Sequence, residues 1–303
     1  MCCVCADDGK QTVKESNASI EYKCYGASHF LALRDMLGLS NEDYIAAVCK
    51  QPWKAFSTNS KSGQHFFLVA NGRFVVKTIS KQEGKFFQSI LGPMVKYLKE
   101  NPKSVLNRIL GLYRLKSKEH TVVKAHFIVM QSILYEGSDR TLQYVFDLKG
   151  STHGRSARLE HQDQPETKTT HTLKDNDWIA DKRFIEIGSK AGAVLIDQID
   201  KDVRFLAKFS SMDFSMLVGI FRKKTDSSDT DISKPLMTLW QGVGSQSEVE
   251  FSIGVIDFLT QWNSKKRVAS YAKRMFVSRS TLSTVPPSEY SSRFSAFMRS
   301  IIK

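Results

Sequence analysis

Apolar side chains recur at two different spacings in the first third of the chain, and each spacing predicts one kind of element. Over residues 28–50 they fall about one helical turn apart, which predicts helical structure. Residues 65–79, HFFLVANGRFVVKTI, contain instead two short apolar runs rich in β-branched and aromatic side chains. Asn71 and Gly72 lie between these runs, and this pair favours the tight turn of a β-hairpin.

A long helix and three further strands are expected next. Residues 80–101 again have helical spacing, with an interruption expected at Gly92 and Pro93 because proline removes a backbone donor. The three strand candidates that follow are LGLYRLK at 110–116, TVVKAHFIVMQSI at 121–133 and LQYVFDLKG at 142–150.

The second half of the chain mixes polar loops with long apolar segments. Residues 153–176 are polar and read as a loop, and 179–209 read as a turn or short strand followed by a long helix. MDFSMLVGIF at 212–221 is apolar almost throughout and is interpreted as a pair of strands, and 223–235 is a polar loop. A further apolar run, IGVID, ends at Asp257.

This order of elements predicts a two-lobed α+β protein, with an antiparallel sheet flanked by helices. The chain of 303 residues is long enough for two packed lobes. We divide it into a flexible polar segment at 1–19, an N-terminal lobe at 20–140 and a C-terminal lobe at 141–303.

The net charge of +13 is concentrated at the C-terminal end of the chain. Residues 261–303 contain one acid, Glu289, and nine basic residues: Lys265, Lys266, Arg267, Lys273, Arg274, Arg279, Arg293, Arg299 and Lys303. A charge of +8 over so short a segment indicates a polyanionic partner, either nucleic acid or the anionic face of a membrane. No recognised nucleic-acid motif accompanies it, so we expect a membrane partner and no nucleic acid, and keep a nucleic-acid binder as a rival.

All five cysteines lie in the first 49 residues, which argues against a disulfide framework and for a reducing compartment. Cys2, Cys3 and Cys5 fit either S-acylation or a loose terminus, and both readings stay open. The sequence has no signal-peptide pattern and no apolar run near the roughly 18–20 residues that cross a bilayer, so no transmembrane segment is expected.

Two turns have the composition of phosphate-binding sites. Ser62 and Gly63 end a polar loop before the hairpin, and Lys77 follows on its second strand, an arrangement that a kinase small lobe uses on ATP phosphates. Lys149 opens the stretch KGST, a cation beside a small turn whose free backbone N–H groups would suit a phosphate. An ordinary surface lysine and an ordinary polar turn are the alternatives.

Two aspartates lie at the ends of apolar strands. Asp213 precedes one strand and Asp257 ends another, inside an apolar run where a bare carboxylate costs several kcal/mol or more, on the order of ion desolvation. They could converge on a metal-bound triphosphate, one positioning a hydroxyl nucleophile and the other holding Mg²⁺. For either residue alone, a helix cap or a satisfied turn explains it as well.

Taken together, these motifs resemble one family. FVVKTIS, FDLKGSTHGR, TLKDNDW, MDFSMLVGI, IGVIDFLTQWNSKKR and PPSEYSSRFSAFM are similar, in order, to the catalytic domain of the phosphatidylinositol phosphate kinases. The resemblance covers roughly residues 55–303. It implies a fold distantly like that of protein kinases, ATP and Mg²⁺ as cofactors, and transfer of phosphate to a phosphatidylinositol monophosphate, giving phosphatidylinositol 4,5-bisphosphate.

The resemblance also assigns residues to the nucleotide. Lys77 and Lys149 would lie at the ATP phosphates, and Ser62 with Gly63 would cover the nucleotide. Glu83 would pair with Lys77.

The remaining roles belong to the reacting groups. Asp213 would be the catalytic residue that orients or deprotonates the inositol hydroxyl, and Asp257 would be the Mg²⁺ ligand. Arg155 would face the phosphate already present on the substrate.

Residues 265–287 would form the activation, or substrate-specificity, loop of the family. Its apolar residues lie at helical spacing, and they are Val268, Tyr271, Ala272, Met275 and Phe276. The basic residues that flank this stripe are Lys265, Lys266, Arg267, Lys273 and Arg274. This is the pattern of a helix lying in an anionic membrane interface, so we expect peripheral binding at the cytosolic face of membranes, foremost the plasma membrane.

Ala269 departs from the family's 5-kinases, which act on the 4-phosphate and have a glutamate there. An alanine resembles the 4-kinases that act on the 5-phosphate, whereas residues 80–102 resemble the 5-kinases. We expect a phosphatidylinositol-4-phosphate 5-kinase and keep the 5-phosphate 4-kinase open. A phosphoinositide-binding scaffold with weak or no turnover is a third reading, because Gly63 alone serves the nucleotide turn. Oligomeric state stays open.

Overall fold

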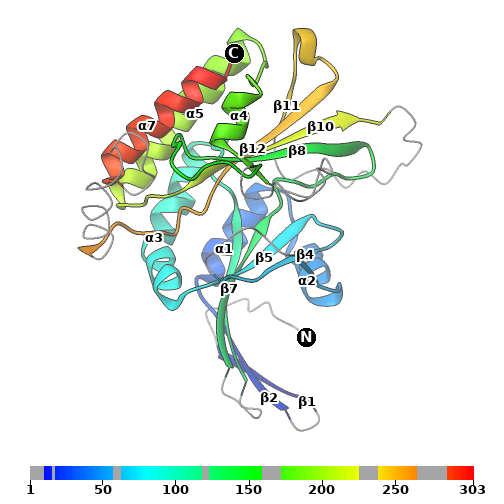
Figure 1. The fold of residues 1–303 in the computed structure, drawn as a ribbon. Coiled ribbons are helices and arrows are strands. Elements are labelled where there is room, and N and C mark those ends of the chain that lie inside the picture. The colour runs from blue at the N-terminus through cyan, green and yellow to red at the C-terminus, as the bar shows by residue number, and fades with distance from the viewer. Residues whose placement is uncertain are drawn as a thin grey trace. The chain divides into compact units, whose positions relative to one another are not determined.

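The computed structural model describes seven stretches of the chain: 10–15, 18–56, 63–117, 123–158, 172–224, 238–264 and 285–303. The chain forms two compact units (Figure 1). One consists of Met1–Pro102 with Asn107–Tyr135, and the other of Lys103–Leu106 with Glu136–Lys303. Both combine helices with a sheet whose strands are all or mostly antiparallel, so the predicted α+β class is confirmed.

The first unit is built on a seven-stranded sheet in the order β1-β2-β6-β7-β5-β4-β3, with all neighbours antiparallel. The strands are β1 (Lys10–Glu15), β2 (Ala18–Cys24), β3 (Lys54–Phe56), β4 (Phe66–Val69), β5 (Phe74–Ile79), β6 (Ile109–Ser117) and β7 (Val123–Gln131). The predicted hairpin joins β4 to β5, and Asn71 and Gly72 in its turn have φ of 53° and 87°. Positive φ at both positions explains the choice of these residues.

The start of the chain differs from the expectation of a loose segment at 1–19. β1 lies within it and pairs along its length with β2. The residues of β1, KQTVKE, are mostly polar, so hydrophobic periodicity gave no signal for a strand there.

Three helices belong to the first unit: α1 (Ala27–Met36), α2 (Asn41–Lys50) and α3 (Lys81–Glu100). The predicted helical segment 28–50 is therefore two helices, separated at Gly38, which has φ of 63°, and restarted by the Ser40 side chain, which accepts from the Asp43 amide.

The expected interruption of the helix at Pro93 was wrong, because α3 runs without a break through it. One face of α3 buries six large apolar side chains: Phe86, Phe87, Ile90, Leu91, Met94 and Leu98. At roughly 1.5–3 kcal/mol for each buried side chain, their packing exceeds the roughly 3 kcal/mol that an internal proline costs.

The second unit has a five-stranded sheet in the order β11-β12-β10-β8-β9. Its strands are β8 (Arg140–Leu148), β9 (Leu173–Lys174), β10 (Ser215–Lys223), β11 (Leu239–Gln241) and β12 (Val249–Ile256). The predicted strand pair at 212–221 is instead the single central strand β10, buried over most of its length. A strand covered on both faces has a continuous apolar sequence, which explains the wrong interpretation.

Helices pack around this sheet: α4 (Asp175–Ala180), α5 (Ser189–Lys208), the 3-10 helix η1 (Gly244–Gln246) and α7 (Pro287–Ile301). β9 and the start of α4 fall in the segment predicted as a loop. Figure 1 shows α5 and α7 side by side, and the Ser291 hydroxyl of α7 donates to the Val203 carbonyl of α5. No helix in the described stretches is both long and apolar enough to cross a bilayer.

Candidate active site

Three neighbouring strands of the second unit bring the predicted residues to one edge of the sheet. β10 pairs with β12 so that Ser215 lies opposite Ile256, and with β8 so that Met216 lies opposite Leu148. Asp213 precedes β10, Asp257 follows β12, and Lys149 follows β8. An antiparallel strand begins at the end of the sheet where its neighbours finish. The strand register therefore brings these three residues together.

Both aspartates have a left-handed backbone, with φ of 62° at Asp213 and 61° at Asp257. Such a conformation costs a non-glycine residue about 1–3 kcal/mol and persists only where the surroundings hold it. Here the segments beside the two residues are bonded to each other: the Met212 amide donates to the Thr260 carbonyl (3.0 Å) and the Trp262 amide to the Ser210 carbonyl (2.8 Å). The turns that carry Asp213 and Asp257 are therefore one connected structure.

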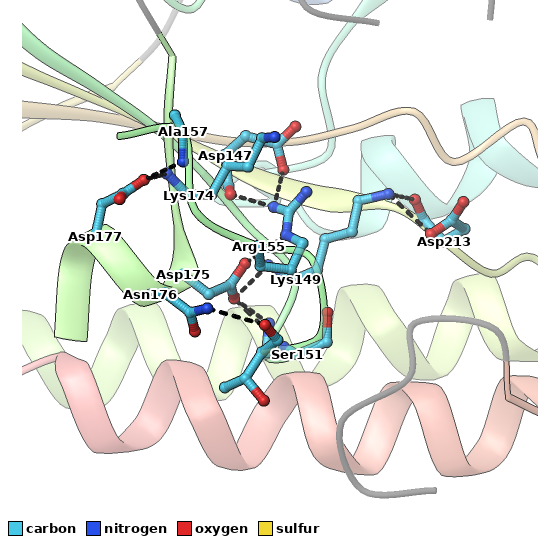
Figure 2. Close-up of polar contacts among 12 residues, drawn as sticks. Asp147, Lys149, Ser151, Arg155, Ala157, Lys174, Asp175, Asn176, Asp177 and Asp213 are labelled. Atoms are coloured by element: carbon cyan, nitrogen blue, oxygen red, sulfur yellow. Dashed lines mark hydrogen bonds and ion pairs between the residues drawn. The ribbon is translucent and has the colours of Figure 1, made fainter. Parts of the chain in front are cut away.

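Lys149 and Asp213 form a close ion pair (Figure 2). The Lys149 amine donates to Asp213 Oδ1 at 2.8 Å and to the Asp213 carbonyl at 2.9 Å. The lysine side chain is 16% exposed and the aspartate side chain 30%. Burial disfavours the charged amine, but the Asp213 and Asp147 carboxylates outweigh it and raise the pKa of Lys149. A protonated amine thus stands beside the carboxylate proposed to act on the substrate hydroxyl.

The backbone N–H groups of the turn at Lys149 are not free, contrary to the expectation that they would suit a phosphate. Asp175, at the start of α4, accepts from the amides of Lys149 (2.9 Å) and Gly150 (2.7 Å) and, at a longer 3.4 Å, from Ser151. The Asp175 carboxylate therefore accepts the amide hydrogen bonds that a bound phosphate was expected to accept.

Arg155 lies between two carboxylates of the same unit. Its Nη2 donates to Asp147 Oδ1 at 2.8 Å and its Nε to Asp175 Oδ2 at 2.7 Å, and Nη2 also contacts the Asp147 carbonyl. Burial alone would raise the pKa of Asp147, but the charges of Arg155 and Lys149 lower it. The predicted contact of Arg155 with a substrate phosphate stays a prediction. The guanidinium nitrogen that would make it is Nη1, since the hydrogen bonds to described residues use Nε and Nη2.

α7 supports the turns at Asp213 and Lys149. The Tyr290 hydroxyl donates to the carbonyl of Phe214, the residue after Asp213, and the Tyr290 ring packs edge-on against Phe214 with 4.8 Å between centroids. Gly150 has φ of 65°, and a Cβ added there would lie 3.0 Å from Phe297 Cβ and 3.3 Å from the Arg293 carbonyl. Only glycine lets the Lys149 turn approach α7 so closely.

The nucleotide residues predicted in the first unit lie on or beside its hairpin. Lys77 is in the middle of β5, between Phe66 on β4 and Ile128 on β7, and is only 6% exposed. Gly63 has φ of 65°. The Glu83 carboxylate accepts from the Ser80 amide (2.7 Å) in a capping box and from Gln64, and its expected ion pair with Lys77 stays a prediction.

Several predicted residues lie outside the described stretches. They are Ser62 and, in the proposed membrane loop, Lys265, Lys266, Arg267, Ala269, Lys273 and Arg274.

The donor set fits a magnesium ion bound together with nucleotide. The described residues contain no group of three or more His, Cys, Asp or Glu side chains that would hold a metal by themselves. Mg²⁺ is commonly held by one or two carboxylates with phosphate oxygens and water completing its shell. Asp257, which follows β12, supplies one such carboxylate.

Two residues that matter to the geometry were missed in the sequence, Asp147 and Asp175. Asp147 lies in the apolar run YVFDL, and the argument that singled out Asp257 applies to it equally. Asp175 opens the run DND before Trp178, a pattern typical of a helix start.

Comparison with known proteins identifies the family. The family model described as Phosphatidylinositol-4-phosphate 5-Kinase matches residues 47–249 and 241–301. The phosphatidylinositol 4-phosphate 5-kinase its3 of Schizosaccharomyces pombe is 27% identical over 361 residues, covering 97% of this chain and 48% of that protein. The phosphatidylinositol 4-phosphate 5-kinase type-1 beta of Gallus gallus is 26% identical, covering 91% and 57%.

A relative of the other regiochemistry is equally similar. The phosphatidylinositol 5-phosphate 4-kinase type-2 alpha of Gallus gallus is 27% identical, covering 93% of this chain and 78% of that protein. The chain spans about half the length of the its3 protein. Because the family model matches most of the chain, including the strands beside Lys149, Asp213 and Asp257, the chain belongs to the phosphatidylinositol phosphate kinase family.

Proposed function

We propose that this protein transfers the γ-phosphate of ATP to a phosphatidylinositol monophosphate and forms phosphatidylinositol 4,5-bisphosphate. The proposal rests on one observation above all: Lys149, Asp213 and Asp257 meet at one edge of the five-stranded sheet. Phosphoryl transfer requires a carboxylate to act on the hydroxyl, a second carboxylate to hold a metal ion, and a cation to neutralise phosphate charge.

In this proposal, the Asp213 carboxylate accepts a hydrogen bond from the inositol hydroxyl and then its proton. The hydroxyl oxygen forms a bond to the γ-phosphorus as the bond from phosphorus to the bridging oxygen breaks, and ADP leaves. Lys149, already 2.8 Å from Asp213, holds its ammonium where negative charge gathers on the transferring group.

The nucleotide is held from several positions. Asp257 would hold Mg²⁺, which when bound neutralises charge on the phosphates of ATP. Lys77 would contact the phosphates, and the turn at Ser62 and Gly63 would cover them. Arg155 would lie near the phosphate already on the inositol.

For regiochemistry, we propose a phosphatidylinositol-4-phosphate 5-kinase. Two of the relatives described above are named for this activity. The alternative, a 5-phosphate 4-kinase, is favoured by Ala269 and by a relative of equal identity that carries that name. Both reactions give the same product.

The proposed site of action is the cytosolic face of a membrane, the plasma membrane foremost. The sequence after Asn263 combines basic and apolar residues in a pattern that suits anionic lipid, each basic residue contributing about 1 kcal/mol near a membrane surface. Replacing both Met275 and Phe276 with Asp should release the protein from anionic vesicles while nucleotide binding persists. Unchanged vesicle binding would count against an inserted helix.

The experiment is phosphate transfer from labelled ATP to vesicles that contain either phosphatidylinositol 4-phosphate or 5-phosphate. We expect faster turnover on the 4-phosphate, and we expect Asp257→Ala to abolish transfer on both. Preference for the 5-phosphate, shifted towards the 4-phosphate by Ala269→Glu, would support the alternative. If the protein bound vesicles but the wild type and Asp257→Ala both gave only background phosphate transfer, the scaffold interpretation alone would remain.

A further inference from the structure

The start of α4 holds residues 149–157, here called the Lys149 loop, at several points along their length. Asp175 accepts from the backbone of its first three residues, as described above. The Asn176 amide donates to the Arg155 carbonyl at 2.9 Å, and its side chain donates to the Thr152 carbonyl at 2.9 Å. Figure 2 shows Asp175 and Asn176 beside Lys149, Ser151 and Arg155 of the loop.

Among these contacts, those of Asp175 alone reach the catalytic end of the loop. One carboxylate oxygen accepts from the amide of Lys149 itself, and the other holds Nε of Arg155, whose Nη2 is bonded to Asp147 on the preceding strand. Asp175 is fully buried. One side chain therefore fixes the backbone from which the Lys149 amine extends towards Asp213.

We infer that Asp175 is a positioning residue: it sets the direction of the Lys149 side chain so that the ammonium is delivered to Asp213. The inference rests on the proposed function, since it gives Lys149 and Asp213 their parts in the transfer. A hydrogen bond to an ionised acceptor is short and strong, and a carboxylate bonded to two or three amides and a guanidinium has few other orientations available. Asp175 itself touches neither nucleotide nor lipid in this proposal.

Asp177 provides a matched control on the same helix. It is likewise a buried carboxylate, and its oxygens accept from the Ser156 hydroxyl (2.7 Å), the Ala157 amide (2.8 Å) and the Lys174 amide (2.9 Å). These hydrogen bonds reach Ser156 and Ala157 at the far end of the loop and Lys174 before α4, but not the turn at Lys149. Loss of Asp177 should weaken the packing of α4 without turning Lys149.

Asparagine is the most informative replacement for Asp175. The amide oxygen can still accept from the turn, but the amide nitrogen would meet Nε of Arg155, and two donors then face each other. Asp175→Asn thus removes the Arg155 bond and the charge with little change of volume. Asp175→Glu keeps the charge and should recover part of the lost rate.

The first test is a double-mutant cycle on the transfer rate. We expect Asp175→Asn to lower kcat at least tenfold and to change the KM for ATP less than threefold, with the Asp177→Asn variant within threefold of the wild type in kcat. In a Lys149→Met background, Asp175→Asn should lower kcat less than threefold further. The same tenfold loss in both backgrounds would overturn the inference, because the residue would then act independently of Lys149.

A second measurement does not need turnover, so it separates this inference from the proposed function. Lys149 is modified with an amine-reactive reagent and quantified by mass spectrometry, under conditions where each variant is folded. We expect Asp175→Asn to raise the modification rate of Lys149 at least threefold, and the Asp177→Asn variant to leave it unchanged. An unchanged rate in folded Asp175→Asn would overturn the inference, whereas absence of turnover in the wild type would overturn the proposed function alone.

Discussion

Gly150 and Gly154 form a natural pair for testing how tightly the Lys149 loop is held against α7. Both have the left-handed backbone, with φ of 65° and 64°. A Cβ at Gly150 would lie 3.0 Å from Phe297 Cβ and 3.3 Å from the Arg293 carbonyl, whereas a Cβ at Gly154 would have no neighbour within 4 Å. Alanine at each position therefore imposes the same backbone strain, but only one of the two variants also adds a clash.

The expected magnitudes follow from these two terms. A left-handed alanine costs about 1–2 kcal/mol, offset by about 0.4–1 kcal/mol because alanine restricts the unfolded chain. Gly154→Ala should thus lower the free energy of unfolding by about 1 kcal/mol. Carbon atoms pack best at about 3.5–4 Å, so Gly150→Ala must push α7 or the loop aside, which adds about 1–3 kcal/mol. We expect a total of about 2–4 kcal/mol.

The assay is urea unfolding followed by tryptophan fluorescence, which reports mainly the second unit because Trp178, Trp240 and Trp262 of the four tryptophans lie in it. An unchanged slope against urea would show that the two variants unfold to similar states. If Gly150→Ala and Gly154→Ala were destabilised equally within about 0.5 kcal/mol, close packing of this loop on α7 would be refuted.

Three further predictions concern the framework of the second unit. Tyr290→Phe keeps the ring but leaves the Phe214 carbonyl without its donor, and should lower the free energy of unfolding by about 1–2 kcal/mol; no change would argue against that hydrogen bond. Asp202→Ala removes a fully buried acceptor of the Val105 amide (2.8 Å) and should lower the free energy of unfolding in urea by about 2–3 kcal/mol. Its control, Asp197→Ala, loses only an exposed ion pair and should change that free energy by no more than about 0.5 kcal/mol. Equal effects of the two substitutions would contradict the role of the buried Asp202. The hydrogen bond from Arg158 lowers the pKa of Asp181 below its ordinary 3.8, so its stabilisation is complete above that pH and is lost as the pH falls through the folded value. Unfolding measured from pH 5 to pH 2 should therefore depend less on pH in Asp181→Asn, and an identical dependence would contradict the assignment.

The sequence predicts those features that local patterns determine. The hairpin at Asn71 and Gly72 follows from a turn that needs two positive φ values, and the α+β class follows from the order of the elements. The prediction failed where packing outweighs local preference. α3 continues through Pro93 because its apolar face is buried, and β10 reads as two strands because both of its faces are covered.

The sequence marks candidate site residues one by one, but it does not predict the contacts among them. Strand ends mark Asp213 and Asp257 as candidates, and the register that brings them together is a pairing between segments about 40 residues apart, beyond the reach of local periodicity. The same limit explains the turn at Lys149. Its composition suits a phosphate, yet the carboxylate that occupies it comes from Asp175, 24–26 residues further along the chain.

The central claim is that Asp213 acts on the inositol hydroxyl, and one comparison tests it most directly. The initial rate of phosphate transfer from ATP to phosphatidylinositol 4-phosphate vesicles is measured for the wild type and for Asp213→Asn, which preserves the shape of the side chain. We predict measurable transfer by the wild type and a loss of at least a hundredfold in the variant, in line with the usual contribution of a positioned general base, with ATP binding retained. A variant that keeps its rate within threefold of the wild type would contradict the account.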